Sequence, residues 1–396
     1  MRVNAAVSHP GHDRFALEEV ELSGPGPGEA LVRVAGAGVC HTDIAFRATL
    51  PHPAILGHEG AGVIEELGAG VSGFRPGDHV VLTFDSCGTC GNCLDAMPAY
   101  CDGFSSRNMR ALRPDGSSAV LGAAGRPVGN RWFGQSSFAQ YCLATTRNMV
   151  PVPDDLPIAT AGPLGCGVQT GAGAVLAGMR VEAGTGIAVF GAGAVGLSAI
   201  MAARVAGAAR VIAVDLHESR RGLALELGAT EVYDGADPEL AERILGDTSG
   251  VHYAFDTSGN PSVIRTALRV LRPLGLCGLV AVGGGDLVLP QQLLGSGRRL
   301  ANLREGNVVP QTFIPRLVRL WRQGRFPFDQ LVSTYGLDEI NDAVADSLSG
   351  VAVKPVLLPT GTTTPQMPAA PAPGNRTNIK RKGARRDRVR SALSAK

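Results

Sequence analysis

Four cysteines within one short stretch are the clearest sign of chemistry in this chain. They are Cys87, Cys90, Cys93 and Cys101, with the spacing C-x2-C-x2-C-x7-C. Short steps allow three thiolates to come from one tight loop, and the fourth returns later to close a tetrahedron around a metal. Four thiolates leave no coordination position open for a substrate. The spacing therefore predicts a structural zinc site, since four unrelated cysteines would rarely fall so close together.

A second set of metal-ligating residues is dispersed along the chain. It comprises Cys40, the stretch Gly57-His58-Glu59, and Cys166. Two thiolates and one imidazole leave one position of a tetrahedral zinc ion free, which is the arrangement of catalytic zinc. Each residue alone is ambiguous, because a buried cysteine usually packs as a small hydrophobe. Their occurrence together predicts a second, catalytic zinc.

A glycine-rich turn supplies the third chemical signal. Gly191, Gly193 and Gly196 follow a β-branched run at 187–190 and precede a helix-like apolar stretch from Leu197. This is the G-x-G-x-x-G pattern in the context it requires, a strand before and a helix after. The glycines permit a tight turn and close backbone approach, and the helix N-terminus would face a pyrophosphate. We predict a dinucleotide site.

One acidic residue indicates which dinucleotide binds. A second predicted strand, 211–214, ends at Asp215, nineteen residues after Gly196. A carboxylate at this point hydrogen-bonds the adenosine ribose and repels a 2′-phosphate, which favours NAD over NADP. His217, Arg220 and Arg221 follow closely and leave a phosphate-binding alternative open. We expect Arg220 to flank the adenosine.

The elements that must position these residues alternate between strand and helix. Beyond Asp215 we predict a strand at 251–257, a helix at 261–271 and a strand at 276–282. This alternation predicts an α/β fold with a parallel, doubly wound sheet. The uncharged stretch 186–203 has nearly the length of a membrane span. Its turn-spaced glycines favour a buried strand leading into a helix instead, so we expect no membrane span.

Length and composition agree with a two-domain enzyme. The chain has 396 residues, 44% of them hydrophobic, which is enough for two cores. No basic leader with an apolar segment begins the sequence, so we expect no signal peptide and a cytoplasmic location. Eight cysteines in such a chain are typical of metal ligands rather than of a disulfide framework.

The last segment differs in composition from the rest. Residues 361–396 contain nine Lys or Arg residues and one acidic residue, Asp387, after a stretch rich in Thr, Pro and Ala. Such a composition cannot bury a core, so we predict a disordered basic tail at 360–396. Such a tail could bind nucleic acid or an acidic surface, but we favour a solvated extension without function.

The order of these motifs resembles the zinc-containing medium-chain alcohol dehydrogenases. Within that family the chain looks most like the bacterial aryl-alcohol (benzyl-alcohol) dehydrogenases, to which the stretches 40–43, 133–139 and 165–173 are similar. The resemblance covers residues 1–359. It implies a β-rich, GroES-like catalytic domain at 1–167, a Rossmann domain with a doubly wound parallel sheet at 168–301, and a return to the catalytic domain at 302–359.

The resemblance also implies roles at the two metal sets. Cys40, His58 and Cys166 would hold the catalytic zinc, with Glu59 as an occasional fourth ligand, so that two zinc ions bind per chain. Asp43 would accept the second ring N–H of His58. Thr42 would accept the proton of the alcohol.

The family's better-known members continue the proton relay with a histidine where this chain has Ala45. Water or His52 would take the last step. The loop between Cys40 and His58 is also shorter by a couple of residues than in similar sequences.

For the cofactor, the resemblance implies contacts from five further residues. Val195 and Thr170 would hold the nicotinamide ring, and His41 and Lys354 would meet the pyrophosphate. Val282, at the end of the last predicted strand, would also contact NAD. Members of the family form homodimers or homotetramers, and we expect one of these states.

The substrate is indicated by two adjacent aromatic residues. Trp132 and Phe133 occupy positions that line the alcohol pocket in the family, which suits a flat benzylic or allylic alcohol. The alternative is that one of them only packs the core. Oxidation of the alcohol to the aldehyde with NAD is the expected reaction, and terpenoid alcohols such as geraniol stay open as substrates.

Two other functions are alternatives. A dehydrogenase for a hydroxymethyl-thiol conjugate (formaldehyde dehydrogenase) would need cations at the cleft mouth, which Arg107, Arg110 and Arg113 could supply. A non-catalytic member that only binds nucleotide or a partner would have lost a zinc ligand, and no ligand is lost. We expect a small alcohol or aldehyde as the partner, and neither a membrane nor nucleic acid.

Overall fold

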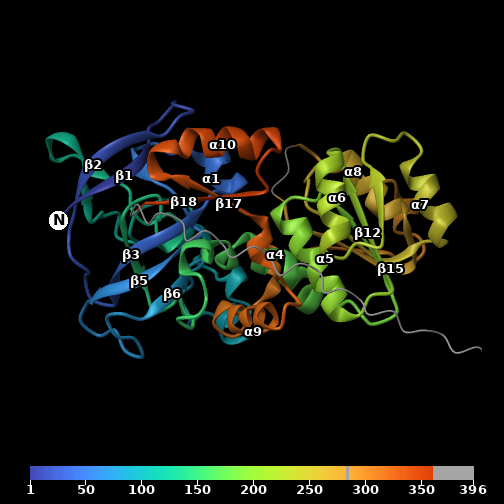
Figure 1. Cartoon of the computed structure of the whole chain (residues 1–396), viewed down its shortest axis with the longest axis horizontal. Coiled ribbons are helices and arrows are strands. Elements are labelled where there is room, and N and C mark those ends of the chain that lie inside the picture. The colour runs from blue at the N-terminus through green and yellow to red at the C-terminus, as the bar shows by residue number, and fades with distance from the viewer. Residues whose placement is uncertain (282–284, 360–396) are drawn as a thin grey trace, which may run out of the picture. The chain divides into compact units, whose positions relative to one another are not determined.

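The computed structural model describes residues 1–281 and 285–359 (Figure 1). Val282 and the tail at 360–396 lie outside the described residues, so the predictions made for them stay predictions. No helix in the described ranges is long and apolar enough to span a membrane. The uncharged stretch 186–203 forms strand β11 followed by helix α5, as predicted.

Two sheets form the β-rich part of the molecule. The first is five-stranded and antiparallel, in the order β4-β1-β2-β7-β8. Its strands are β1 (Arg2–Ser8), β2 (Ala16–Leu22), β4 (Ala54–Ile55), β7 (Val120–Leu121) and β8 (Pro127–Val128). In β1 the last four residues are all buried, since this strand packs on the core beneath the metal-binding loops.

The second sheet is seven-stranded and joins the two ends of the chain. Its order is β10-β6-β5-β3-β18-β17, and β9 also pairs with β3. The strands are β3 (Glu29–Gly38), β5 (Gly60–Leu67), β6 (His79–Leu82), β9 (Tyr141–Thr145), β10 (Met149–Pro151), β17 (Val332–Gly336) and β18 (Lys354–Leu358). Because β18 pairs antiparallel with β3, the C-terminal segment returns to the sheet that the N-terminal half builds.

The third sheet is six-stranded and parallel, in the order β13-β12-β11-β14-β15-β16. Its strands are β11 (Gly186–Phe190), β12 (Arg210–Asp215), β13 (Glu231–Asp234), β14 (Val251–Asp256), β15 (Leu271–Leu279) and β16 (Arg299–Asn302). The crossover helices are α5 (Ala194–Ala206), α6 (Glu218–Leu227), α7 (Leu240–Thr248) and α8 (Pro261–Arg269). They surround the sheet in Figure 1.

The burial pattern of β11 shows that this sheet is doubly wound. Ile187 and Val189 belong to the core cluster that contains α5, whereas Ala188 and Phe190 belong to the cluster that contains α7 and α8. Side chains alternate between the faces of a strand, so both faces of the sheet are covered by helices. The predicted α/β fold class is confirmed.

The remaining helices lie outside the parallel sheet. They are α1 (His41–Phe46), α2 (Gly91–Leu94), α3 (Phe104–Asn108), α4 (Gly167–Gly173), α9 (Pro310–Arg322) and α10 (Ile340–Ser349). The loops also contain three short 3₁₀ turns that carry residues of the candidate sites: η1 (Pro98–Tyr100), η3 (Trp132–Gly134) and η8 (Arg304–Asn307).

The predicted strand at 276–282 starts earlier in the structure, because β15 begins at Leu271 and ends at Leu279. Its first half is irregular: the register with β14 shifts, and Leu274 has a φ of 64°. Exposed Arg272 and Pro273 break the apolar pattern that marks a strand, which is why the sequence did not indicate this start.

Candidate metal centres and cofactor site

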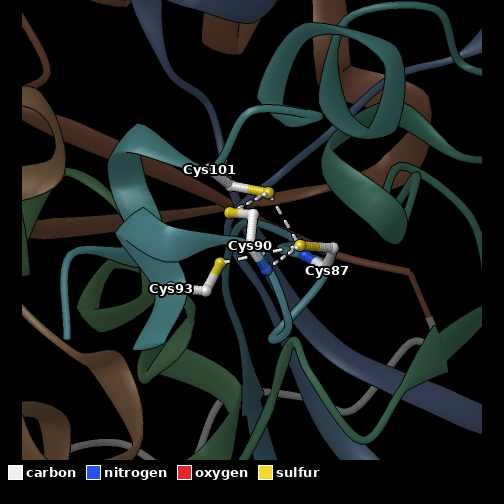
Figure 2. A group of neighbouring side chains, drawn as sticks. All are labelled: Cys87, Cys90, Cys93 and Cys101. Carbon is white, nitrogen blue, oxygen red and sulfur yellow. Dashed lines mark hydrogen bonds between the residues drawn. The ribbon is translucent and has the colours of Figure 1, made fainter. Parts of the chain in front are cut away.

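The four clustered cysteines converge on one point (Figure 2). Their sulfur atoms all lie within 4.8 Å of one another, with Cys87 Sγ 3.9 Å from Cys93 Sγ and Cys90 Sγ 4.0 Å from Cys101 Sγ. A tetrahedron of zinc–sulfur bonds of about 2.3 Å has edges of roughly 3.8 Å. The donor set therefore fits a structural zinc ion.

Local turns hold these sulfurs in place. Gly88 adopts a φ of +76°, which turns the chain between the first two ligands. The backbone N–H groups of Thr89 and Cys90 donate to Cys87 Sγ at 3.4 and 3.2 Å. These bonds lower the pKa of Cys87 to about 5, so this sulfur is a thiolate at neutral pH.

The dispersed set also comes together. Ligand atoms of Cys40, His58, Glu59 and Cys166 lie within 4.8 Å of one another, and His58 Nε2 is 3.3 Å from Cys166 Sγ. Cys40 directly precedes α1, His58 and Glu59 precede β5, and Cys166 precedes α4. A hydrogen bond from the Cys166 thiol lowers the pKa of Cys40 well below its usual range, against the effect of burial. Two sulfurs and an imidazole nitrogen thus fit a zinc ion with an open position.

A buried carboxylate orients the imidazole ligand. Asp43 Oδ1 lies 2.7 Å from His58 Nδ1 and also accepts the Gly57 N–H, while Asp43 Oδ2 accepts the Cys40 N–H. With Nδ1 donating to Asp43, the Nε2 lone pair of His58 points to the metal set. The structure therefore places Asp43 where the resemblance expected it.

Trp132 completes this arrangement rather than lining a pocket. Its indole N–H donates to Asp43 Oδ1 over 2.9 Å, and its side chain is 0% exposed. The prediction that Trp132 faces the substrate does not match the structure, because the indole is enclosed and its polar end is used by Asp43. Phe133 is the aromatic residue beside the metal set: its ring stacks on the imidazole of His58 with centroids 4.3 Å apart.

Glu59 and Lys354 form a buried ion pair behind the ligands. Lys354 Nζ donates to Glu59 Oε1 at 3.0 Å and to the Val39 carbonyl, and the Gly167 N–H donates to Glu59 Oε1. Burial disfavours the charge on Lys354, but Glu59 and Cys40 outweigh burial and raise its pKa. The charge of Lys354 compensates this buried carboxylate. The predicted contact of Lys354 with a pyrophosphate stays a prediction.

The glycine-rich loop has the shape that a pyrophosphate requires. Gly191 has a φ of +95°, and a Cβ at Gly196 would lie 1.8 Å from the Gly191 carbonyl oxygen. At Gly193 a Cβ would meet only Arg220 Nη1, at 3.7 Å, so the loop is open where α5 begins. Burial lowers the pKa of His41, and the nearby charges of Lys354 and Arg220 lower it further. His41 and Arg220 are therefore close enough to interact electrostatically.

A cavity of about 500 Å³ adjoins this loop and includes Asp215, His217 and Arg220 in its wall. Its size suits an adenosine group. Asp215 Oδ2 accepts the Ala192 N–H at 2.7 Å, so the carboxylate is fixed beside the loop. Arg220 Nε is buried and has no hydrogen-bond partner within residues 1–281 and 285–359, which fits a phosphate or ribose ligand.

The remaining predicted residues lie on α4, on α5, on α1 and in the loop after α1. Thr170 on α4 and Val195 on α5 come from helices in close contact, since a Cβ at Gly171 would lie 2.0 Å from the Val195 carbonyl oxygen. Thr42 lies in α1, next to Asp43. His52 Nε2 is buried and has no hydrogen-bond partner in the described part of the chain, so it is not hydrogen-bonded to Thr42.

Sequence reasoning missed Glu305, a carboxylate in η8. Its Oε2 lies 3.3 Å from Gln169 Nε2 and 3.4 Å from Thr170 Oγ1. No motif surrounds this residue, and a single Glu-Gly pair after the last predicted strand is too common a pattern to indicate a site.

Comparisons with known proteins agree with this geometry. Residues 26–154 match the alcohol dehydrogenase GroES-like domain, and residues 194–320 match the zinc-binding dehydrogenase domain. The geraniol dehydrogenase of Castellaniella defragrans is 44% identical over 89% of this chain and 97% of its own.

Two solved structures are similar over 90% of this chain and 99% of their own. The benzyl alcohol dehydrogenase of Acinetobacter calcoaceticus has 41% identity and a TM-score of 0.85. An alcohol dehydrogenase zinc-binding domain protein of Burkholderia ambifaria has 45% identity and a TM-score of 0.88. With its two cysteine-containing metal sets and its dinucleotide-binding sheet, the chain belongs to the zinc-dependent medium-chain alcohol dehydrogenases.

Proposed function

We propose that this protein oxidises a primary alcohol with an aromatic or allylic group to its aldehyde, with NAD as the cofactor. The observation that carries the proposal is the open metal set of Cys40, His58 and Cys166, whose imidazole is fixed by Asp43. A zinc ion held there would act as a Lewis acid that lowers the pKa of the alcohol, and bound NAD would accept the hydride.

The chain's own residues orient the substrate and remove its proton. Thr42, on the helix that starts after Cys40, is the proposed proton acceptor. Phe133 supplies an apolar surface against His58, which favours a flat ring over a short aliphatic chain. Because Ala45 offers no imidazole, we propose that water takes the proton from Thr42 onward.

Support for NAD comes from Asp215. The carboxylate is held at the rim of the adenosine-sized cavity by the Ala192 and His217 N–H groups. A fixed negative charge there disfavours a 2′-phosphate. The substrate class draws support from relatives whose names state geraniol and benzyl alcohol as substrates.

A hydroxymethyl-thiol conjugate is the second candidate, since an S-(hydroxymethyl)glutathione dehydrogenase of Paracoccus denitrificans is 32% identical over 90% of this chain. The ion pairs at the proposed arginines do not favour this substrate. Arg107 is bonded to Asp85 and Arg113 to Glu29, so two of the three arginines proposed for such a substrate are already paired.

The test is a substrate panel with NAD and NADP on the zinc-loaded enzyme. The panel contains benzyl, cinnamyl, geranyl and ethyl alcohols and S-(hydroxymethyl)glutathione. We expect benzyl and cinnamyl alcohol to exceed ethanol in kcat/KM by about tenfold to a hundredfold, because a buried ring adds a few kcal/mol of apolar contact. A preference for ethanol or for the glutathione conjugate would contradict the proposal.

A further inference from the structure

Glu305 is a buried carboxylate that the mechanism above does not use. Burial raises its pKa to about 7, and its only hydrogen bonds with side chains in the described ranges are the long ones with Gln169 and Thr170. Within these ranges no Lys, Arg or His lies within ion-pair distance of it. By contrast, Glu59 is paired with Lys354, and Glu29 is paired with Arg113 and Arg131. A buried charge left in this state is costly unless a ligand compensates it.

The backbone around Glu305 is held in an unusual conformation. Glu305 has a φ of 50°, a left-handed value that is uncommon for a residue other than glycine. The neighbouring Gly306 lies directly on α4: a Cβ there would come within 2.8 Å of the Gln169 carbonyl oxygen. Strained backbone of this kind persists only where the surrounding structure fixes it, and it is concentrated at functional sites.

From the other side, Tyr100 of η1 fixes the same turn. The Tyr100 hydroxyl donates to the Asn302 carbonyl and lies 2.7 Å from Asn307 Oδ1, and it accepts the Arg304 N–H. The Arg304 guanidinium packs over the ring of Phe104 at 4.8 Å. The carboxylate is therefore presented by a rigid turn rather than by a free loop.

The position of Glu305 indicates what it meets. It is close enough to His58, Cys40 and Cys166 to interact with them electrostatically, and its Oε2 lies 3.4 Å from Thr170 Oγ1. Thr170 lies beside Val195, where the glycine-rich loop passes into α5. The carboxylate thus lies near the metal set and within 3.4 Å of Thr170, the residue that the proposed function assigns to the nicotinamide ring.

We propose that Glu305 is a cofactor-binding residue that recognises the nicotinamide end and favours the oxidised cofactor. The oxidised ring carries a positive charge and the reduced ring carries none. The carboxamide NH₂ is a hydrogen-bond donor in both forms, so it does not distinguish them. A carboxylate beside the ring stabilises the charged form selectively. This inference rests on the proposed function, because it takes a nicotinamide cofactor as given.

The test compares the affinities of zinc-loaded wild-type and Glu305→Gln protein for NAD⁺ and NADH. Calorimetry gives both Kd values without turnover. Glutamine keeps the size and an acceptor oxygen but removes the charge, so we expect the Kd for NAD⁺ to rise about tenfold and that for NADH to change less than about threefold. Glu226→Gln is the control, because Glu226 is an exposed residue of α6, and this variant should change neither Kd.

Two further variants, Glu305→Asp and Glu305→Ala, test whether the charge of Glu305 causes the preference for NAD⁺. Glu305→Asp keeps the charge and should retain more of the NAD⁺ preference than Glu305→Gln or Glu305→Ala. If the Kd values of Glu305→Gln for NAD⁺ and NADH rise equally, or if neither changes, this inference is wrong while the proposed function stands. If the wild type binds NADP⁺ and NADPH instead, the same ratio is measured with that pair. Failure to bind any nicotinamide cofactor would overturn the proposed function as well.

Discussion

The two metal centres are built in opposite ways. The ligands at 87–101 come from one short stretch of chain, and the N–H groups of Thr89 and Cys90 donate to the first of them, Cys87. Cys40, His58 and Cys166 come from three separate elements and depend on hydrogen bonds between residues far apart in sequence. A closed site can thus be formed by its own loop, whereas an open site requires the surrounding fold to hold its ligands.

The largest expected effect concerns the open centre. Cys166→Ala should remove the catalytic zinc and lower kcat by at least about 10³-fold, because the charge stabilisation by such an ion is worth several kcal/mol. The protein should keep its circular dichroism spectrum and one zinc per chain by elemental analysis. Near-normal turnover in this variant would show that the open set is not the reaction centre.

At the closed centre the same type of change should act on stability. Cys93→Ala should lower Tm by roughly 5–10 °C, since zinc binding at a closed site contributes directly to folding. Calorimetry with metal analysis measures this. An unchanged Tm with one zinc lost would mean that the loop does not need its metal.

A smaller effect is expected behind the open centre. Trp132→Phe removes the indole N–H that Asp43 accepts, and should weaken zinc binding at that centre about tenfold while leaving the ratio of benzyl alcohol to ethanol activity unchanged. Competition with a chelator measures the affinity. Trp321→Phe is the matched control, because Trp321 makes the same type of bond to Asp329 elsewhere. A changed substrate ratio would instead return Trp132 to the pocket wall.

An effect of similar size is expected outside both centres. Asp215→Gly removes a fixed carboxylate from the adenosine-sized cavity, and should move the NAD to NADP ratio of kcat/KM toward NADP by at least about tenfold. Zinc content and Tm should stay near the wild-type values. An unaltered ratio would mean that other residues, such as Arg220, decide the preference.

The sequence could predict the features that are encoded locally, but not the contacts between residues that are far apart along the chain. The four-cysteine spacing and the glycine-rich turn are local patterns, so their residues, their elements and the fold class could be predicted from the chain alone. The bond from Trp132 to Asp43, the pair of Lys354 with Glu59 and the place of Glu305 join residues that are far apart in sequence. No spacing encodes them, so the sequence indicated neither these contacts nor the enclosure of Trp132.

Tyr100 belongs to the loop between Cys93 and Cys101, yet its hydroxyl binds the turn that carries Glu305. Tyr100 therefore connects the loop that would hold the structural zinc with the turn that would contact the cofactor. Thermodynamic linkage requires any such coupling to be reciprocal. If cofactor binding orders the turn that Tyr100 holds, it raises the affinity of the four-cysteine loop for zinc by the same factor by which zinc there raises the affinity for the cofactor.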